Sequence, residues 1–256
     1  MKKSITFLMF CVLINAKLGC EVKNAQFINK GDDSLLRLNE FGLVSIDKPL
    51  RLHLGCGENY FDGYVNIDFP SSEHTFQQKT IANVYADITI LNFPENSVNE
   101  VRSHHVFEHF ERPISMALLC NWSKWLKVGG CLVIETPDFE ESVKLFCNPN
   151  LPYEAKQMIL RHVFGSHEAR WAVHCDGWYQ EKFASILGKL GFSGIRFQKG
   201  GGLIKNILVI AYKDKNFDLS QLSEIAKKIL QESLVDPIEV QLHNVWCSDF
   251  DKYFYM

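Results

Sequence analysis

The stretch Leu52-His53-Leu54-Gly55-Cys56-Gly57 decides the fold of this chain of 256 residues. Leu50, Leu52 and Leu54 alternate with polar residues, and this period of two is typical of a strand with one buried face. The two glycines that follow allow a sharp turn and let a ligand approach the backbone closely. The sequence therefore predicts a strand that ends in a glycine turn.

Short strands and helices alternate after this turn. We expect strands at 64–67, 84–86, 100–104 and 131–135, helices at 113–126 and 178–190, and a closing strand pair at 195–197 and 206–212. We also expect Gly129 and Gly130 to end the first helix, because glycine accepts the left-handed cap conformation. Alternating strands and helices predict an α/β fold with a doubly wound, mostly parallel sheet wrapped on both sides.

The length fits one α/β domain with appendages. We place an apolar leader at 1–20, the main domain at 21–215 with 21–48 as its amino-terminal cap, and a helix with an aromatic tail at 216–256. A free tail of this kind would expose apolar rings, so we expect it to dock on the domain.

The composition excludes several classes of protein. A chain with 46% hydrophobic and 22% charged residues is neither disordered nor collagen-like. The net charge of -3 provides no positive field for phosphates, so we expect no nucleic-acid partner. The eight cysteines include no Cys-x-x-Cys pair, and we assign no metal site from the sequence.

Two aspartates follow the next two predicted strands. The carboxylate of Asp68 offers two acceptors for the hydroxyls of a ribose, while Asp87 can accept from an exocyclic amino group with Ile88 packed on a base. Each aspartate, taken singly, also fits a turn or a helix cap. Together with the glycine turn they indicate a nucleotide site at the carboxyl edge of a parallel sheet.

Seven segments in order resemble the class I S-adenosylmethionine-dependent methyltransferases of the type-11 kind. The resemblance is strongest to a bacterial branch of predicted methyltransferases that is linked to surface polysaccharide synthesis. The segments are Leu52–Gly57, Gly63–Asp68, Ala86–Ile88, Phe93–Val98, His105–His109, Leu126–Gly130 and Thr136–Asp138. The resemblance implies a Rossmann-like seven-stranded sheet whose last strand pair has an antiparallel member.

The same resemblance implies an enzyme that transfers a methyl group from S-adenosylmethionine to a small-molecule or glycan acceptor, which we expect to be a hydroxyl. It places Gly55 and Gly57 against the methionine part of the cofactor, Asp68 at the ribose, and Asp87 with Ile88 at the adenine. The whole predicted cofactor site is Gly55, Cys56, Gly57, Asp68, Asp87, Ile88 and His104.

Two features depart from the family pattern. His53 stands where an acidic residue is common, which puts a contact to the cofactor ammonium in doubt. Asp68 also follows Gly55 so closely that a crossover helix has little room. We predict a turn or a short helix between them.

The stretch His105-Val106-Phe107-Glu108-His109 follows the fourth predicted strand, where the resemblance implies that it faces the transferred methyl group. An imidazole can accept the proton of a hydroxyl near neutral pH. We predict His109 as the catalytic base and His105 as the second choice. A purely structural role that shapes the pocket is an equal alternative for each.

Two other functions remain open. The same stretch matches the H-x-x-E-H pattern of inverted zinc peptidases, so a secreted zinc hydrolase is one alternative, although Arg112-Pro113 disfavours the long helix it needs. A fold that binds the cofactor without catalysis is the other.

The resemblance places acceptor contacts after the fifth strand. Aromatic faces with polar neighbours suit a sugar or an aromatic ring, although the same residues also fit a packed lid. The predicted acceptor-binding residues are Asp138, Arg170, His174 and Trp178.

The amino terminus has the layout of a secretory signal, with Lys2 and Lys3 before an apolar run from Ile5 to Ala16. The run is too short to span a membrane, and it is the only segment through which we expect membrane association. Because the methyl donor is made in the cytosol, we expect a cytoplasmic protein.

Overall fold

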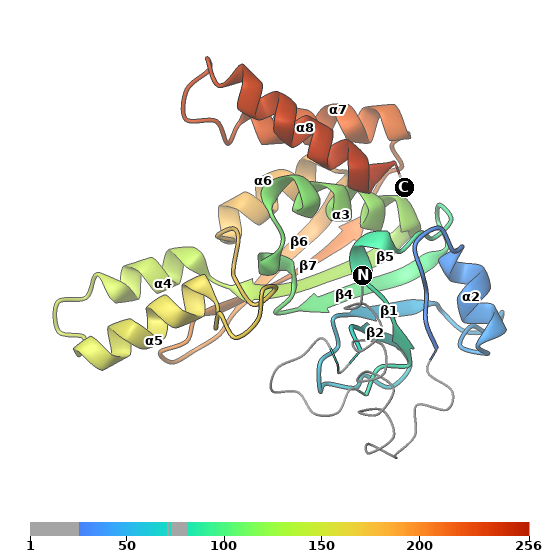
Figure 1. Cartoon of the computed structure of the whole chain (residues 1–256), viewed down its shortest axis with the longest axis horizontal. Helices are drawn as coiled ribbons and strands as arrows, with labels where there is room; N and C mark the ends of the chain where they lie inside the picture. Colours follow the sequence, from blue (N-terminus) through green and yellow to red (C-terminus); the bar gives the residue numbers. More distant parts are fainter. Residues whose placement is uncertain (1–25, 71, 73–80, 256) are drawn as a thin grey trace, which may run out of the picture.

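The computed structural model describes residues 26–70, 72 and 81–255, and the predicted leader lies outside them. One sheet of seven strands runs through the molecule in the order β3-β2-β1-β4-β5-β7-β6 (Figure 1). The strands are β1 (Arg51–Leu54), β2 (Val65–Asp68), β3 (Val84–Tyr85), β4 (Val98–His104), β5 (Leu126–Pro137), β6 (Phe192–Lys199) and β7 (Asn206–Lys213).

The five strands β3, β2, β1, β4 and β5 are all parallel to one another, and β7 is antiparallel to both β5 and β6. The short connection between β6 and β7 explains their direction, because a parallel pair needs a crossover of about a dozen residues. The predicted α/β fold with a mostly parallel seven-stranded sheet and one antiparallel member is confirmed.

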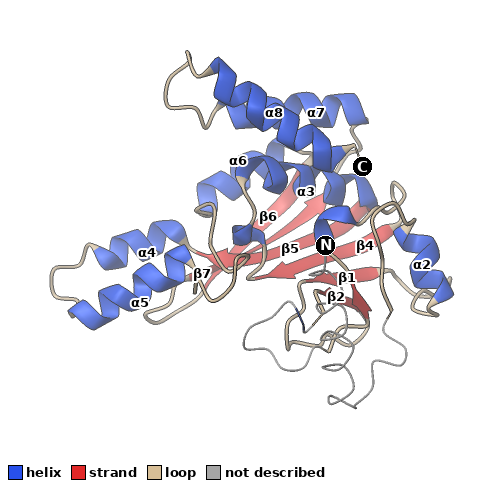
Figure 2. Ribbon diagram, in the orientation of Figure 1, coloured by secondary structure: helices blue, strands red, loops and turns tan. Residues whose placement is uncertain are grey.

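Helices α3, α6, α7 and α8 lie on one side of the sheet, while α4 and α5 project as a pair beyond its end (Figure 2). The helices are α2 (Ser34–Glu40), α3 (Arg112–Trp125), α4 (Phe139–Phe146), α5 (Tyr153–Phe164), α6 (Gln180–Lys189), α7 (Leu219–Gln231) and α8 (Val240–Phe254), with short 3₁₀ helices η2 (Ile88–Ile90) and η3 (Phe107–His109). The sequence pattern did not predict α2, α4, α5 or α8, the last of which lies in the predicted aromatic tail.

The two faces of the central strands differ in burial. Val101 and Ser103 on β4 are fully buried, whereas Glu100, Arg102 and His104 on the same strand are half-buried. The alternation follows the period of two of a strand. The buried set belongs to the face that packs on the apolar core, and the polar set belongs to the opposite face.

The end of α3 differs from the prediction. The helix stops at Trp125, because Leu126 already has an extended backbone (φ -64°, ψ 137°) and begins β5. Gly129 has a positive φ of 81°, but it lies within β5, next to an irregularity in the pairing with β4. The prediction that the glycine pair ends the helix is therefore wrong.

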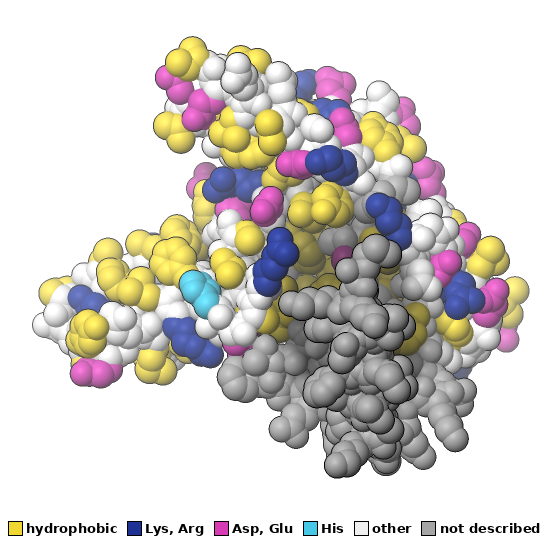
Figure 3. All heavy atoms as spheres, in the orientation of Figure 1, with side chains coloured by type: hydrophobic (Ala, Val, Ile, Leu, Met, Phe, Trp, Pro, Cys, Tyr) yellow, Lys and Arg dark blue, Asp and Glu magenta, His cyan; other side chains and the backbone are white. Residues whose placement is uncertain are grey.

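The carboxyl-terminal helix α8 packs across α3. The rings of Phe250 and Phe254 are buried, and the side-chain amide of Asn121 on α3 donates to the carbonyl O of Tyr253 at 3.0 Å. Around these elements, acidic and basic side chains are mixed over the visible face (Figure 3). Among the described residues, no helix has both the length and the apolar character needed to cross a bilayer.

The packing of α8 gives a stability prediction. We expect Phe250→Ala to lower the free energy of unfolding by about 3–5 kcal/mol, because it leaves a cavity in the core. Val245→Ala on the same helix is exposed and should cost less than about 0.5 kcal/mol. Urea unfolding of both variants measures the difference, and equal small losses would contradict a docked α8.

Candidate functional site

The glycine turn and Asp68 meet at the carboxyl edge of the sheet. The backbone N–H groups of Gly55 and Cys56 donate to the carbonyl O of Ile67 at 2.8 and 3.1 Å, which ties the turn to β2. The N–H of Gly57 donates to Oδ2 of Asp68, and the N–H of Phe69 donates to Oδ1 at 2.7 Å. Asp68 is buried and oriented toward the turn, as the nucleotide-site prediction requires.

The two glycines of the turn differ in the space that surrounds them. Both have a positive φ, of 70° at Gly55 and 54° at Gly57, which favours glycine. A Cβ on Gly55 would lie 2.2 Å from Cγ2 of Val106, so protein fills the space that was predicted for a ligand. Among the residues that the structure describes, nothing lies within 4 Å of a Cβ on Gly57. Only Gly57 therefore offers open space to a ligand.

Asp87 lies just beyond the end of β3, the strand that pairs with β2 and its terminal Asp68. In the β2–β3 pair, Asp68 is in register with Tyr85, and the N–H of Ala86 donates to the carbonyl O of Asp68 at 3.0 Å. Oδ1 of Asp87 caps η2, accepting from the N–H of Thr89 at 2.8 Å and from its hydroxyl at 2.7 Å. The two acids thus share one sheet edge, and Asp87 also has the capping role that the sequence left open.

Two other predicted cofactor residues are buried. Cys56 lies inside the turn, and burial, together with the charge of Asp68, raises the pKa of its thiol to about 12. The thiol is therefore neutral and poorly nucleophilic at physiological pH. The side chain of Ile88 is 6% exposed and belongs to the hydrophobic core.

The connection between β1 and β2 has turns and no crossover helix, as predicted from its length. Asn66 holds it in place. Its Oδ1 accepts from the N–H of Phe61 at 3.0 Å, and its Nδ2 donates to the carbonyl groups of Phe61 and Tyr64 at 3.0 and 3.2 Å. Asn66 was not identified from the sequence, because no local pattern shows that a buried asparagine makes several hydrogen bonds to a neighbouring loop.

His53 also contacts Asn66. Nδ1 of His53 lies 3.0 Å from Oδ1 of Asn66, and its ring packs on Phe61 with centroids 4.4 Å apart. Burial lowers the pKa of His53 to about 4, with smaller contributions from His104 and Arg102. A neutral imidazole thus occupies the position where the family commonly has an acid.

His104 lies on the polar face of the sheet. Its Nδ1 is 3.0 Å from Oε2 of Glu135, and its Nε2 is 3.3 Å from Nη1 of Arg102. Burial lowers the pKa of His104, against the opposing effect of Glu135. Its ring also meets that of His53 edge-on at 5.9 Å. The side chain is thus held by protein partners on this face.

The backbone excludes a helical metal motif in the H-x-x-E-H stretch. His105 has a positive φ of 54°, and only Phe107–His109 form a helix, a single 3₁₀ turn without a side-chain cap. Histidines at i and i+4 share one face only in a continuous α-helix. The zinc-peptidase interpretation of this stretch is therefore contradicted.

His105 lies between two carboxylates. Its Nδ1 is 3.4 Å from Oε1 of Glu108, and its Nε2 is 3.5 Å from Oε1 of Glu135 and 3.2 Å from Nδ2 of Asn206. Burial alone would lower the pKa of His105, but the two carboxylates raise it. Both ring nitrogens of His105 thus have polar neighbours.

His109 and His174 face one another across two segments of the chain. Their rings are T-shaped with centroids 4.7 Å apart. Nδ1 of His109 lies 3.1 Å from the carbonyl O of Val173, and Nδ1 of His174 lies 3.2 Å from that of Val163. Each Nδ1 therefore carries the proton, and each Nε2 carries a lone pair.

A reverse turn brings His174 to this position. Gly165 pairs with Val173 in an isolated antiparallel bridge, and a Cβ on Gly165 would lie 2.4 Å from the carbonyl O of Ala172. The N–H of Cys175 then donates to the carbonyl O of Glu108 at 2.8 Å. These contacts join the segment 165–178 to η3.

The predicted acceptor residues separate into two groups. Asp138 is fully buried and caps α4, and Trp178 is buried between the rings of Phe107 and Phe183. These two predictions need correction, because neither side chain has a surface that an acceptor could touch. Arg170 is exposed and His174 is half-buried, so both are accessible.

A groove of about 690 Å³ lies beside His174. Its wall includes an ionic group in which Nζ of Lys182 is 2.6 Å from Oδ2 of Asp176, and Nη2 of Arg112 is 3.5 Å from Oδ1. Phe139 adds an aromatic surface. No local sequence signal marks Arg112 or Lys182 as groove residues, because surface charges on helices are common.

Neither a protein-family model nor a curated protein matches the chain. Among solved structures, it is similar to a protein from Bordetella parapertussis described as a possible exported protein (16% identity, 66% of this chain and 63% of that one, TM-score 0.44). It is also similar to a SAM-dependent methyltransferase from Methanosarcina mazei (16% identity, 70% of this chain and 97% of that one, TM-score 0.45). A third similar structure is human N-acetylserotonin methyltransferase in complex with SAM (17% identity, 65% of this chain and 48% of that one, TM-score 0.43).

The chain spans less than two thirds of the Bordetella and human proteins. Sequence identities of 16–17% and TM-scores below 0.5 do not define the fold, which is established by the strand order of the chain itself. The order and the single antiparallel strand agree with the Rossmann-like sheet that the sequence resemblance implies.

The burial of His53 predicts a pH dependence of stability. Its folded pKa of about 4 is below the unfolded value of 6.5, so the unfolded state binds more protons between these values. Stability from this group is complete above the unfolded pKa and is lost as pH falls. The loss between about pH 7 and about pH 5 should be on the order of 2 kcal/mol.

Urea unfolding at the two pH values measures this loss. His53→Gln cannot titrate and can still donate to Asn66, so it should show a smaller loss than the natural chain. The exposed His167→Gln serves as the control and should behave as the natural chain does. The same loss in all three proteins would exclude His53 as its source.

Proposed function

We propose that this chain transfers a methyl group from S-adenosylmethionine to a hydroxyl of a small molecule or glycan. The observation that carries the proposal is the open space at Gly57 beside the buried carboxylate of Asp68, with Asp87 just beyond the end of the neighbouring strand β3. This edge is where open α/β sheets bind nucleotides. The sequence resemblance supplies the identity of the nucleoside.

The residues at the edge suit such a cofactor. Each carboxylate oxygen has two lone pairs, so Asp68 can accept ribose hydroxyls while it holds the N–H groups of Gly57 and Phe69. Oδ1 of Asp87 holds Thr89, and its Oδ2 would accept from the adenine amino group. The other predicted cofactor residues, Gly55, Cys56, Ile88 and His104, would support the cofactor site from around these two aspartates.

The cofactor would supply an electrophilic methyl group, and the protein must align the acceptor with it and remove the acceptor's proton. The geometry favours His109 over His105 as the base. Nδ1 of His109 donates to Val173, which leaves the Nε2 lone pair available, whereas both nitrogens of His105 lie near polar partners. His109 would therefore accept the proton at Nε2.

The groove beside His174 would take the acceptor. Its charged wall of Arg112, Asp176 and Lys182 offers hydrogen bonds to several hydroxyls, and Phe139 offers a flat apolar surface. That combination suits a saccharide. His174 borders this groove, and we also assign to the acceptor Arg170, which is exposed on the same segment of the chain. We propose a role in surface polysaccharide synthesis on the cytoplasmic side.

Cofactor binding can be tested without knowing the acceptor. Calorimetry with S-adenosylhomocysteine should detect binding by the full chain, and Asp68→Ala should weaken it at least about tenfold, as expected for loss of a charged hydrogen bond of ~1.5–3 kcal/mol. Asp62→Asn, an exposed acid of the same connection, should bind as the natural chain does. Absence of binding by the natural chain would refute the proposal.

The proton step gives a separate prediction. With S-adenosylmethionine and a panel of saccharide acceptors, His109→Ala should keep S-adenosylhomocysteine binding but lose about 10²–10⁴-fold in turnover. His167→Ala is the matched control. Unchanged turnover would remove His109 from the mechanism, and binding without turnover in the natural chain on every acceptor would favour the inactive cofactor-binding fold.

A further inference from the structure

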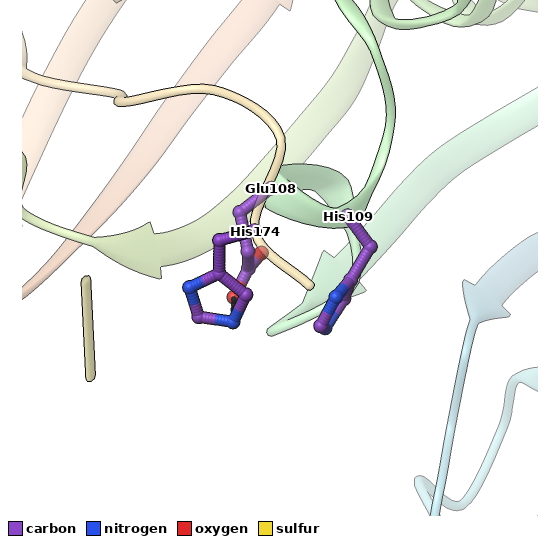
Figure 4. A group of neighbouring side chains, drawn as sticks. All are labelled: Glu108, His109 and His174. Carbon is purple, nitrogen blue, oxygen red and sulfur yellow. Dashed lines mark ion pairs between the residues drawn. The ribbon is translucent and has the colours of Figure 1, made fainter. Parts of the chain in front are cut away.

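The side chains of Glu108, His109 and His174 converge on one point (Figure 4). Glu108 and His109 come from η3, and His174 faces them from the segment 165–178. One ligand atom of each lies within 4.8 Å of those of the other two. Two imidazoles and a carboxylate are a donor set that binds divalent transition metals.

Glu108 is an independent sign of an unoccupied ligand position. Its side chain is 2% exposed, and neither carboxylate oxygen has a hydrogen-bond partner of normal geometry among the described residues. The nearest ionisable groups to it are Nδ1 of His105 at 3.4 Å and Nε2 of His174 at 3.9 Å. A buried carboxylate with so few hydrogen-bonding partners destabilises the folded state through lost solvation, and a bound cation would offset this loss.

The histidines are prepared as ligands by their own hydrogen bonds. Metal-binding histidines usually donate the other ring nitrogen to a carbonyl or carboxylate, which fixes the tautomer. His109 and His174 both do so, through the carbonyl groups of Val173 and Val163. The lone pairs at Nε2 are thereby available to a cation.

The distances allow coordination after small side-chain rotations. Ligands of a tetrahedral zinc ion, at about 2.0–2.1 Å from the metal, lie roughly 3.3 Å apart. Because the three ligand atoms lie within 4.8 Å of one another, no separation has to close by more than about 1.5 Å. A small cavity bordered by Glu108 and His174 lies next to the cluster.

We propose that Glu108, His109 and His174 form a binding site for one divalent transition-metal ion. The site differs from the H-x-x-E-H motif, because His174 replaces His105 and comes from a distant part of the chain. Three protein ligands leave at least one coordination position open, as in catalytic rather than structural zinc sites. An oxygen ligand from water or from an acceptor would occupy it.

The metal site does not depend on methyl transfer. One consequence does rest on the proposed function: a bound cation takes the lone pair of His109, so the metal-loaded chain could not use that nitrogen as the base. An acceptor hydroxyl would instead bind the cation and release its proton to water.

The test uses the full chain, stripped with a chelator and titrated with Zn²⁺ in a calorimeter. We expect one ion per chain, and at zinc concentrations about 100-fold above the dissociation constant the unfolding temperature should rise by about 5–10 °C. Mg²⁺, which prefers oxygen ligands, should produce neither effect. No zinc binding by the natural chain would overturn the proposal.

Variants identify the ligands. Glu108→Gln, His109→Ala and His174→Ala should each weaken zinc binding at least tenfold, while Cys175→Ser and His167→Ala, a neighbouring thiol and an exposed imidazole, should leave it unchanged. Zinc binding that survives in all three ligand variants, or that disappears in Cys175→Ser, would place the ion elsewhere and refute the site.

Glu108→Gln also gives a test that misfolding cannot imitate. Without metal this variant should unfold at the same or a higher temperature than the natural chain, because it removes a buried charge. With zinc the order should reverse. If Glu108 serves only as the partner of His105, the variant is less stable under both conditions, and the proposal fails.

S-adenosylhomocysteine binding is measured on the same samples. Cofactor binding without zinc binding would reject the metal site alone. Zinc binding without cofactor binding would reject the proposed methyl transfer and leave the metal site standing.

Discussion

The packing of Phe107 between Trp122 and Trp178 positions the two segments of the chain that carry His109 and His174. All three side chains are buried, with the Phe107 ring 5.5 Å from Trp122 and 4.7 Å from Trp178. Phe107 fixes the segment that carries the histidines after β4, and Trp178 anchors the segment that carries His174. The hydrophobic effect, which has no directional preference, thus buries these aromatic rings and brings the side chains of His109 and His174 close to one another.

Neighbours of Phe107 in sequence extend this arrangement in two directions. Val106 packs over Gly55 and fixes the glycine turn, while Glu108 and His109 point into the cluster with His174. One short turn therefore links the proposed cofactor edge to the groove proposed for the acceptor. The proposed cofactor site and the proposed metal site are mechanically connected, although each can be tested alone.

The sequence predicted the features that depend on periodicity and on strand ends. The meeting of Asp68 with the glycine turn followed from parallel strands sharing an edge, and the antiparallel strand β7 followed from the resemblance. The role of Gly55 could not be predicted, because its neighbour Val106 is distant along the chain. The burial of Asp138 and Trp178 was missed because composition does not distinguish a lid from a core. The position of His174 depends on a reverse turn at Gly165 that has no periodic signal.

The helix-free connection between β1 and β2 affects how the sheet can assemble. Two parallel strands are usually connected by a crossover that contains a helix. Here β1 and β2 are connected by a short loop that is held by the hydrogen bonds of Asn66. Closing a short loop loses little chain entropy, and contacts of low sequence separation form quickly. Pairing β1 with β2 therefore costs less chain entropy than pairing them through a longer crossover would.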